Sequence, residues 1–327
     1  MSVLRWALLA MILMSVAGTF FALGWWLRGL DMVGRPILEV ESGQGFTVLI
    51  EPGPAEGTAI HGPTGRQVPF LSNSDMNVLD PTGRYLFTSH ETRSEAGVTR
   101  IDLEADEVVV LLHSTQFVRL DGLLWTPWDT LLVAEERQGG QLFEILNPLA
   151  PPERIEYALR PAFGQRRHEG LAIDWRGFFY GVDEDPKGSI YRFRPRSPLS
   201  PDSLASGDLD VLLLLEDSEM LEEHRVQAVW RPAGSGQGTS FDRPEDIEIV
   251  GSVLYVAITG EHRVISIDLA DPEITTVGKY LSGRDEYAEG LDWPDNLASD
   301  LRGTSTLLKT WGRRGSWPGG ETRCGTQ

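Results

Sequence analysis

The feature that most constrains this fold is a repeat of short apolar segments, each of which opens with an acidic residue. The five segments are DMNVLDPTG from Asp75, DGLLWTPWD from Asp121, EGLAIDWRG from Glu169, EDIEIVGS from Glu245 and DNLASDLRG from Asp295. Successive starts lie 46, 48, 76 and 50 residues apart. A period in the forties, built from short alternating segments, is typical of a β-propeller with about four strands in each blade.

A second acid follows the first at a nearly constant distance. The first four segments run through a turn into RYLFTSHE, TLLVAEE, FFYGVDED and VLYVAITGE, and the second acids are Glu91, Glu136, Asp185 and Glu261. The intervals from first to second acid are 16, 15, 16 and 16 residues. Acids at the same strand position in successive blades repeat around the central axis, where they repel one another. The pattern favours a hard cation with oxygen ligands over a set of merely solvated strand ends.

The rest of the chain has the same all-β texture, because Gly, Pro, Asp and Asn separate short alternations. We expect a helix only near 215–228 (LEDSEMLEEHRVQA). The long interval of 76 residues contains a Pro/Ser/Gly-rich insertion at about 195–240.

The N-terminal segment 6–26, WALLAMILMSVAGTFFALGWW, has 21 residues without a charge. At about 1.5 Å per residue, a helix of this length crosses a hydrocarbon core. Trp25 and Trp26, followed by Arg28, suit the far interface. We expect an uncleaved membrane anchor, with a cleaved secretory signal as the alternative. Either assignment places the rest of the chain outside the cytoplasm, in the periplasm or at the cell surface.

Charge and cysteine content exclude two classes of function. The formal net charge of −19 argues against nucleic-acid binding, which needs a basic surface. The single cysteine, Cys324, rules out an intrachain disulfide and a cysteine-based zinc site. We expect a monomer with an anchor and linker at 1–35, a propeller domain at 36–303 and a tail at 304–327.

Four stretches resemble the PhoX-type alkaline phosphatase family over roughly residues 70–300. They are TPWDTLLVAEE (126–136), HEGLAIDWRGFFYGVDEDPKGSIYRF (168–193), DRPEDIEIVGSVLYVAITG (242–260) and LDWPDNLASD (291–300). The resemblance implies a six-bladed propeller that hydrolyses phosphomonoesters outside the cytoplasm with ferric iron and calcium. Its substrate is then a phosphorylated small molecule.

The resemblance also implies roles for individual residues. Glu136, Glu169 and Glu245 match metal-binding glutamates, and Arg243 matches the arginine that holds the substrate phosphate. Asp185 matches a metal-ligand aspartate, with Glu184 as the alternative register. His168 is a candidate to orient Glu169 or the phosphate. Carboxylates suit hard cations, and an arginine can bind two phosphate oxygens at once.

Two departures from the family pattern bear on function. Asp121 stands where the family's phosphatases carry a cysteine iron ligand, which favours calcium or another hard cation over iron. Residues 304–327 contain one acid, Glu321, against four basic residues, and Trp311 stands where the repeat predicts an acid. We interpret this change as a lost reading frame or a truncation that leaves the last blade incomplete.

Three functions therefore compete. The first is a metal-dependent phosphomonoester hydrolase. The second is a non-catalytic, metal-stabilised propeller that acts as a binding module, which the missing cysteine and the altered tail favour. The third is a calcium-dependent lactonase-type hydrolase, which has less use for Arg243 because its substrate is neutral.

Overall fold

The computed structural model describes residues 59–61, 67–69, 73–105, 107–215, 225–282, 293–299 and 306–310. This part of the chain is all-β and contains no α-helix. None of its helices is long and apolar enough to cross a membrane. The expected anchor at 6–26 lies outside the described residues.

Antiparallel strands build the fold, and five single-turn 3₁₀ helices occur in the described connections. The strands are β1 (Ala59–His61), β2 (Gln67–Pro69), β3 (Ser74–Leu79), β4 (Tyr85–His90), β5 (Gly97–Asp102), β6 (Glu107–His113), β7 (Leu120–Trp125), β8 (Leu131–Gly140), β9 (Leu142–Ile145), β10 (Tyr157–Leu159), β11 (Arg166–Ile173), β12 (Phe179–Asp183), β13 (Ile190–Pro195), β14 (Gly207–Leu214), β15 (Val226–Pro232), β16 (Pro244–Val250), β17 (Val253–Ile258), β18 (Arg263–Asp268), β19 (Ile274–Ser282), β20 (Pro294–Ser299) and β21 (Thr306–Thr310). The 3₁₀ helices are η1 (Pro152–Arg154), η2 (Pro161–Phe163), η3 (Ser203–Ala205), η5 (Ala233–Ser235) and η6 (Thr259–Glu261).

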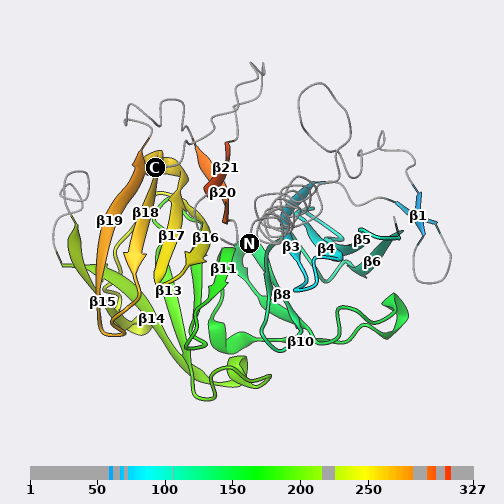
Figure 1. The fold of residues 1–327 in the computed structure, drawn as a ribbon, viewed down its shortest axis with the longest axis horizontal. Helices are drawn as coiled ribbons and strands as arrows, with labels where there is room; N and C mark the ends of the chain where they lie inside the picture. The colour runs from blue at the N-terminus through cyan, green and yellow to red at the C-terminus, as the bar shows by residue number, and fades with distance from the viewer. Residues whose placement is uncertain are drawn as a thin grey trace, which may run out of the picture. The chain divides into compact units, whose positions relative to one another are not determined.

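The described strands form four consecutive antiparallel groups of four: β3–β6, β7–β10, β11–β14 and β16–β19 (Figure 1). Strand β11 also pairs with β8, while β15 joins β14 to β19, so the last three groups make one continuous sheet. A further pair, β20–β21, follows. This succession of four-stranded antiparallel groups is a propeller-like fold. The count of six blades stays a prediction.

Strand β8 shows why some strands of this fold are continuous apolar runs instead of alternating apolar and polar residues. Leu131 and Val133 pack with Phe87 of β4 and Val98 of β5 in one apolar cluster. Leu132 and Ala134 pack with Phe179 of β12 and Phe193 of β13 in another. Because successive side chains of a strand point to opposite faces, β8 is buried on both faces between neighbouring groups. A third cluster joins β12–β14 to β16–β19.

The helix that we predicted near 215–228 lies mostly outside the described residues, and it is wrong at its end, because β15 begins at Val226. Val226, Ala228 and Trp230 are buried with exposed or half-buried residues between them, which is the period of a strand. The predicted insertion at 195–240 contains β14, the fourth strand of its group, as well as β15. Strand β21 lies within the segment 304–327 that we assigned to the tail, and it pairs with β20.

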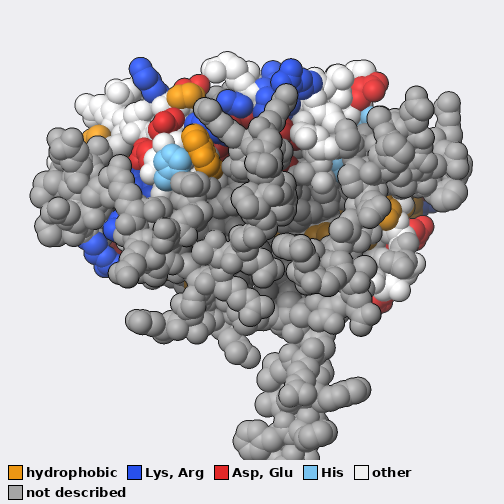
Figure 2. Space-filling model, turned by 90° about the horizontal axis from the view of Figure 1, so that it is seen from above, with side chains coloured by type: hydrophobic (Ala, Val, Ile, Leu, Met, Phe, Trp, Pro, Cys, Tyr) orange, Lys and Arg blue, Asp and Glu red, His pale blue; other side chains and the backbone are white. Residues whose placement is uncertain are grey.

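Charged side chains of opposite sign lie next to one another on the described part of the face in Figure 2. Ion pairs also run through the buried parts of the fold, for example from Arg192 to Asp210 at 2.9 Å and from Arg160 to Glu144 at 2.6 Å. The negative charges of Asp210 and Glu144 are therefore compensated locally. The candidate site is the exception.

Candidate metal centre

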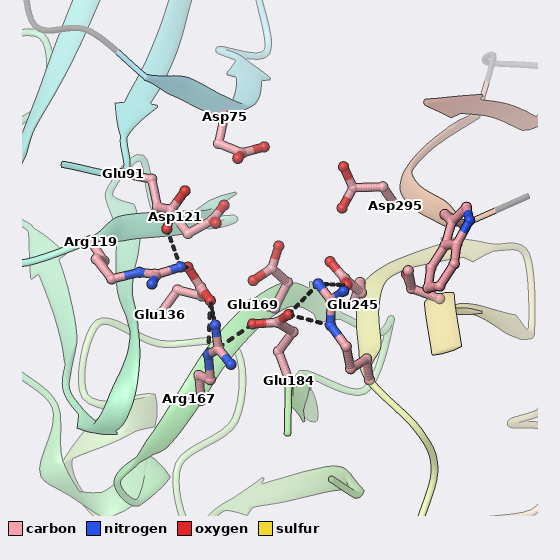
Figure 3. A pocket seen from close by; sticks show the side chains of 13 residues that line it. Asp75, Glu91, Arg119, Asp121, Glu136, Arg167, Glu169, Glu184, Glu245 and Asp295 are labelled. Carbon is pink, nitrogen blue, oxygen red and sulfur yellow. Dashed lines mark hydrogen bonds and ion pairs between the residues drawn. The ribbon is translucent and has the colours of Figure 1, made fainter. Parts of the chain in front are cut away.

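A cavity of about 530 Å³ opens where the starts of successive groups meet (Figure 3). Eight of the residues that line it are carboxylates and three are arginines. The full lining is Asp75, Glu91, Arg119, Asp121, Glu136, Arg167, Glu169, Glu184, Arg243, Glu245, Thr259, Trp293 and Asp295.

Five carboxylates, which we call the inner acids, come from the first strand of each group. They are Asp75 of β3, Asp121 of β7, Glu169 of β11, Glu245 of β16 and Asp295 of β20. These are the residues that open the five repeats in the sequence. Their side chains converge on one space in Figure 3. The repeat therefore places one carboxylate from each group in the same cavity.

A break in the pairing between the first and second strands of a group turns the side chain of the inner acid toward the cavity. The first strand of each four-stranded group shifts register against the second strand around its acid. The shifts fall between Ser74 and Asn77, between Leu120 and Leu123, between His168 and Leu171, and between Pro244 and Ile247. An extra residue in one strand bends it and re-aims a side chain. The same bulge in four groups explains why all four acids face the cavity.

Neighbouring first strands also approach each other very closely. A Cβ atom added to Gly122 would lie 2.0 Å from the carbonyl O of Glu169. One added to Gly170 would lie 2.5 Å from the backbone N of Ile247. Each glycine directly follows an inner acid. Its missing side chain lets the backbones, and hence the carboxylates, come together.

The residue two places before the inner acid is the second repeated element. It has a left-handed backbone at Asn73 (φ 59°), Arg119 (φ 51°), Arg243 (φ 55°) and Trp293 (φ 58°), whereas Arg167 lies within β11. Non-glycine residues adopt this conformation rarely, and clusters of them occur at functional sites. In four of the five repeats, therefore, a left-handed residue precedes the first strand at the cavity.

The three arginines bind three further carboxylates, which we call the outer acids: Glu91, Glu136 and Glu184. Arg119 pairs with both Glu91 and Glu136, and its Nε donates to Glu136 Oε2 at 2.9 Å. Arg167 Nε donates to Glu136 Oε1 at 2.8 Å and lies 2.9 Å from Glu184 Oε2.

Arg243 continues the series to an inner acid. Its Nη2 lies 2.6 Å from Glu184 Oε1 and 2.5 Å from Glu245 Oε1. Acids and arginines therefore alternate from Glu91 to Glu245, as the dashed lines in Figure 3 show in part.

The outer acids do not behave as one electrostatic set, because burial and then contact with Glu136 raise the pKa of Glu91 and of Glu184 to about 8. Burial, followed by the charges of neighbouring acids, raises the pKa of Asp121 and of Glu169 well above the usual range. Burial also raises the pKa of Glu136, but its contacts with Glu184 and Glu91 and the charges of Arg167 and Arg119 bring that pKa down to about 2. The inner acids thus hold negative charge at a high cost unless protons or cations neutralise them.

The donor set fits a hard cation. Asp121 is only 2% exposed, and its Oδ1 accepts no hydrogen bond within the described part of the chain. Three groups of carboxylates bring their oxygens within 4.8 Å of one another: Asp75–Glu91–Asp121, Asp121–Glu136–Glu169 and Glu169–Glu245–Asp295. Calcium takes several oxygen ligands in flexible geometry, which such a set can supply.

Seven residues were proposed from the sequence as metal ligands or phosphate-binding groups, and five of them meet in the cavity: Asp121, Glu136, Glu169, Arg243 and Glu245. Two do not line it, Asp185 and His168. Glu184 takes the place considered for Asp185, whose Oδ1 instead accepts the backbone N–H of Lys187 at 3.1 Å.

His168 is fully buried, stacks on the ring of Phe163 at 5.7 Å, and has Nε2 3.3 Å from the carbonyl O of Gly164. Burial holds its pKa well below the usual value, so it is neutral. This placement gives it a packing role.

Glu261, the second acid of the last complete repeat, also lies away from the cavity lining. It belongs to η6 and pairs with Arg263. The sequence reasoning missed Arg119 and Arg167 as site residues. Their signal is the recurrence of arginine two residues before an acid, in RLD (119–121), RHE (167–169) and RPE (243–245).

Neither a family model nor a curated protein matches this sequence. Solved structures do resemble the fold. One of them is Pseudomonas fluorescens PhoX in complex with vanadate, a transition state analogue. The two structures superpose with a TM-score of 0.54 at 16% sequence identity, and the match covers 81% of this chain and 78% of the PhoX chain.

Weaker similarities extend to a Xanthomonas campestris gluconolactonase (TM-score 0.46, 11% identity, 72% of this chain and 69% of that one). A putative 6-phosphogluconolactonase from Bacteroides uniformis is similar at a TM-score of 0.45 (15% identity, 76% and 69%). At such identities the likeness to PhoX shows a shared propeller-like fold.

Proposed function

We propose that this chain is a metal-dependent phosphomonoester hydrolase of the PhoX type. The observation that carries the proposal is the convergence of five inner acids beside Arg243 in a single cavity. Its fold resembles that of Pseudomonas fluorescens PhoX, a protein whose structure contains a transition state analogue. The resemblance of the sequence motifs in 126–300 to that family supports the same assignment.

The inner acids would hold the metal. Asp121 and Glu169 are buried, Asp295 is half-buried, and none of the three forms an ion pair with a basic residue within the described ranges. Calcium fits this all-oxygen set, and ferric iron would have to bind without the cysteine that the family resemblance predicts. When bound, the cation polarises the phosphoryl group and neutralises the charge that develops on it.

Arg243 is the residue that we assign to the phosphate. Its side chain is the most exposed of the three arginines, at 39%. Nε and Nη2 contact Glu184 and Glu245, whereas Nη1 makes no contact of this kind within the described residues. Nη1 can therefore donate to a phosphate oxygen placed between Arg243 and the inner acids.

Electrostatics make anion binding conditional on the cation. With every group ionised, eight carboxylates and three arginines give the cavity a formal charge of about −5, which repels a phosphate dianion. Bound cations reverse this field. We infer that phosphate and the metal bind in sequence, with the metal first.

The setting that we propose is extracytoplasmic. The uncharged segment 6–26 would anchor the chain in a membrane and place the propeller in the periplasm or at the cell surface.

Hydrolysis of p-nitrophenyl phosphate by the purified full-length chain tests the function. We expect activity that EDTA abolishes and calcium restores, and loss of both calcium and activity in Asp121→Asn. Asp208→Asn, an exposed change in β14 away from the cavity, is the matched control. Hydrolysis that persists unchanged in EDTA would contradict the proposal.

One observation favours a non-catalytic alternative, a metal-stabilised binding module. All three arginines at the cavity are already paired with carboxylates. Calcium that raises the melting temperature without any hydrolysis of phosphomonoesters or lactones would select this alternative.

A further inference from the structure

The outer acids use their oxygens differently from the inner acids. Both oxygens of Glu136 accept hydrogen bonds from guanidinium groups, Oε2 from Arg119 and Oε1 from Arg167. Both oxygens of Glu184 are engaged as well, Oε1 by Arg243 and Oε2 by Arg167. Two-sided pairing of this kind fixes the orientation of a carboxylate and satisfies its charge.

A simple charge count separates the two sets. The three outer acids face three arginines, so this set is neutral when all groups are ionised. The five inner acids include Asp121, Glu169 and Asp295, none of which pairs with a basic residue in the described part of the chain. The uncompensated charge of the cavity therefore resides on the inner acids.

Burial makes the separation matter. The side chain of Glu136 is 4% exposed, and those of Arg119 and Arg167 are 28% exposed. Removing one partner of a buried ion pair leaves the other charge uncompensated, which is strongly destabilising. A cation that recruited Glu136 would have to displace two guanidinium groups, which would lose their partner. Asp121, Glu169 and Asp295 hold no guanidinium group that a cation would have to displace within the described part of the chain.

We propose that Arg119 and Arg167 are positioning residues that act as fixed counter-ions for Glu136, so that divalent cations bind the inner acids only. The inference rests on the metal site of the proposed function and deepens it. It reserves Glu136, which the family resemblance assigns to metal, for the arginines. The number of cations that the cavity holds is then set by the two arginines as well as by its acids.

Calcium binding to the full-length chain tests this inference. The chain is stripped with EDTA and titrated with calcium chloride by isothermal titration calorimetry. In the double variant Arg119→Gln/Arg167→Gln, the freed Glu136 should add a calcium site or raise calcium affinity about tenfold. Arg119→Lys/Arg167→Lys keeps the charges and should behave like the parent chain.

The gain in melting temperature on adding calcium provides a second readout, which a purely structural role would not change. The double glutamine variant should melt lower than the parent in EDTA and gain more than the parent from added calcium. Arg160→Gln is the matched control, because it also removes an arginine from a buried glutamate, Glu144, outside the cavity. It should lower the melting temperature equally with and without calcium.

The reciprocal variant keeps the test decisive if the double variant does not fold. Glu136→Gln should leave the number of bound calcium ions and their affinity unchanged, and a tenfold loss of affinity would overturn the inference. The outcome for the proposed function is separate. A parent chain that binds calcium, with an identical double variant, refutes the inference alone. Calcium binding only in the double variant means that the inner acids bind no cation by themselves, which refutes both the inference and the metal-dependent function, and no binding in either chain refutes both as well.

Discussion

The close approach of the first strands gives the sharpest prediction, because it depends on single missing methyl groups. Replacing Gly122 by alanine puts a Cβ 2.0 Å from the carbonyl O of Glu169, where ordinary contact begins at 3.4 Å. Replacing Gly170 by alanine puts one 2.5 Å from Ile247 N and 2.7 Å from Asp246 Cα. In both variants the new Cβ clashes with backbone atoms of the neighbouring first strand, so one of the two strands must move.

The expected cost follows from that displacement. Overpacking of a well-packed region costs about 1–3 kcal/mol. For a domain of this size, each kcal/mol lowers the melting temperature by about 2–4 °C. A shift of about an ångström also separates Glu169 from Glu245 and Asp295, whose oxygens now lie within 4.8 Å. Calcium affinity should therefore fall about tenfold or more, in line with the 10–100-fold losses seen when residues that support metal ligands are changed.

Thermal denaturation and calcium titration of the two alanine variants check both effects. Gly234→Ala is the control, since a Cβ there meets nothing within 4 Å and the backbone is not left-handed. It should match the parent chain in both assays. If Gly170→Ala keeps the parent melting temperature and calcium affinity, the close approach of β11 and β16 does not build the site.

Three further substitutions separate the roles of neighbouring groups. Arg243→Ala should raise the inhibition constant of inorganic phosphate about tenfold or more while bound calcium, measured by elemental analysis, stays unchanged; equal loss of calcium would make Arg243 a structural residue. Asp246→Ala removes the acceptor of the Ile247 and Leu297 N–H groups, both at 2.7 Å, and should cost about 1–3 kcal/mol for each buried donor left unsatisfied, read as a lower denaturation midpoint; an unchanged midpoint would show that water replaces it. His168→Ala should lower stability by about 1–3 kcal/mol but leave turnover per folded molecule intact, because the ring packs on Phe163 away from the cavity; a loss of turnover at full folding would restore a catalytic role.

The position of each acid along its strand could be predicted from the sequence, because the side chains of a strand alternate between its two faces. Each inner acid opens an apolar alternation, so its position relative to the buried side chains repeats from group to group. This was enough to predict the all-β fold and the meeting of Asp121, Glu169 and Glu245 in one place. It was not enough to foresee the bulges, which are a property of strand pairing.

Two candidate residues, His168 and Asp185, do not line the cavity, and in both cases the neighbouring residue in the sequence does. His168 and Glu169 are neighbours in β11 at its bulge, where Glu169 lines the cavity and His168 packs on Phe163. Glu184 and Asp185 follow β12, and the backbone N–H of Glu184 still donates to the carbonyl O of Arg167 at 2.9 Å, which continues the ladder. A one-residue shift reverses every side chain, and apolar patterning alone does not fix it at a strand end.

The sequence by itself determined that this chain repeats a pair of strands that begins with an acidic residue, and that the carboxylates of successive repeats therefore lie close together. This could be predicted because the periodicity of a strand depends on residues that are near one another in the sequence. Only the tertiary structure decided which arginine compensates which acid. Arg119 follows the first group, yet it reaches Glu91 of that group and Glu136 of the next, and Arg167 joins Glu136 to Glu184 in the same way. These pairs form between strands of successive groups, and their partners depend on how the sheets pack, which no local pattern encodes.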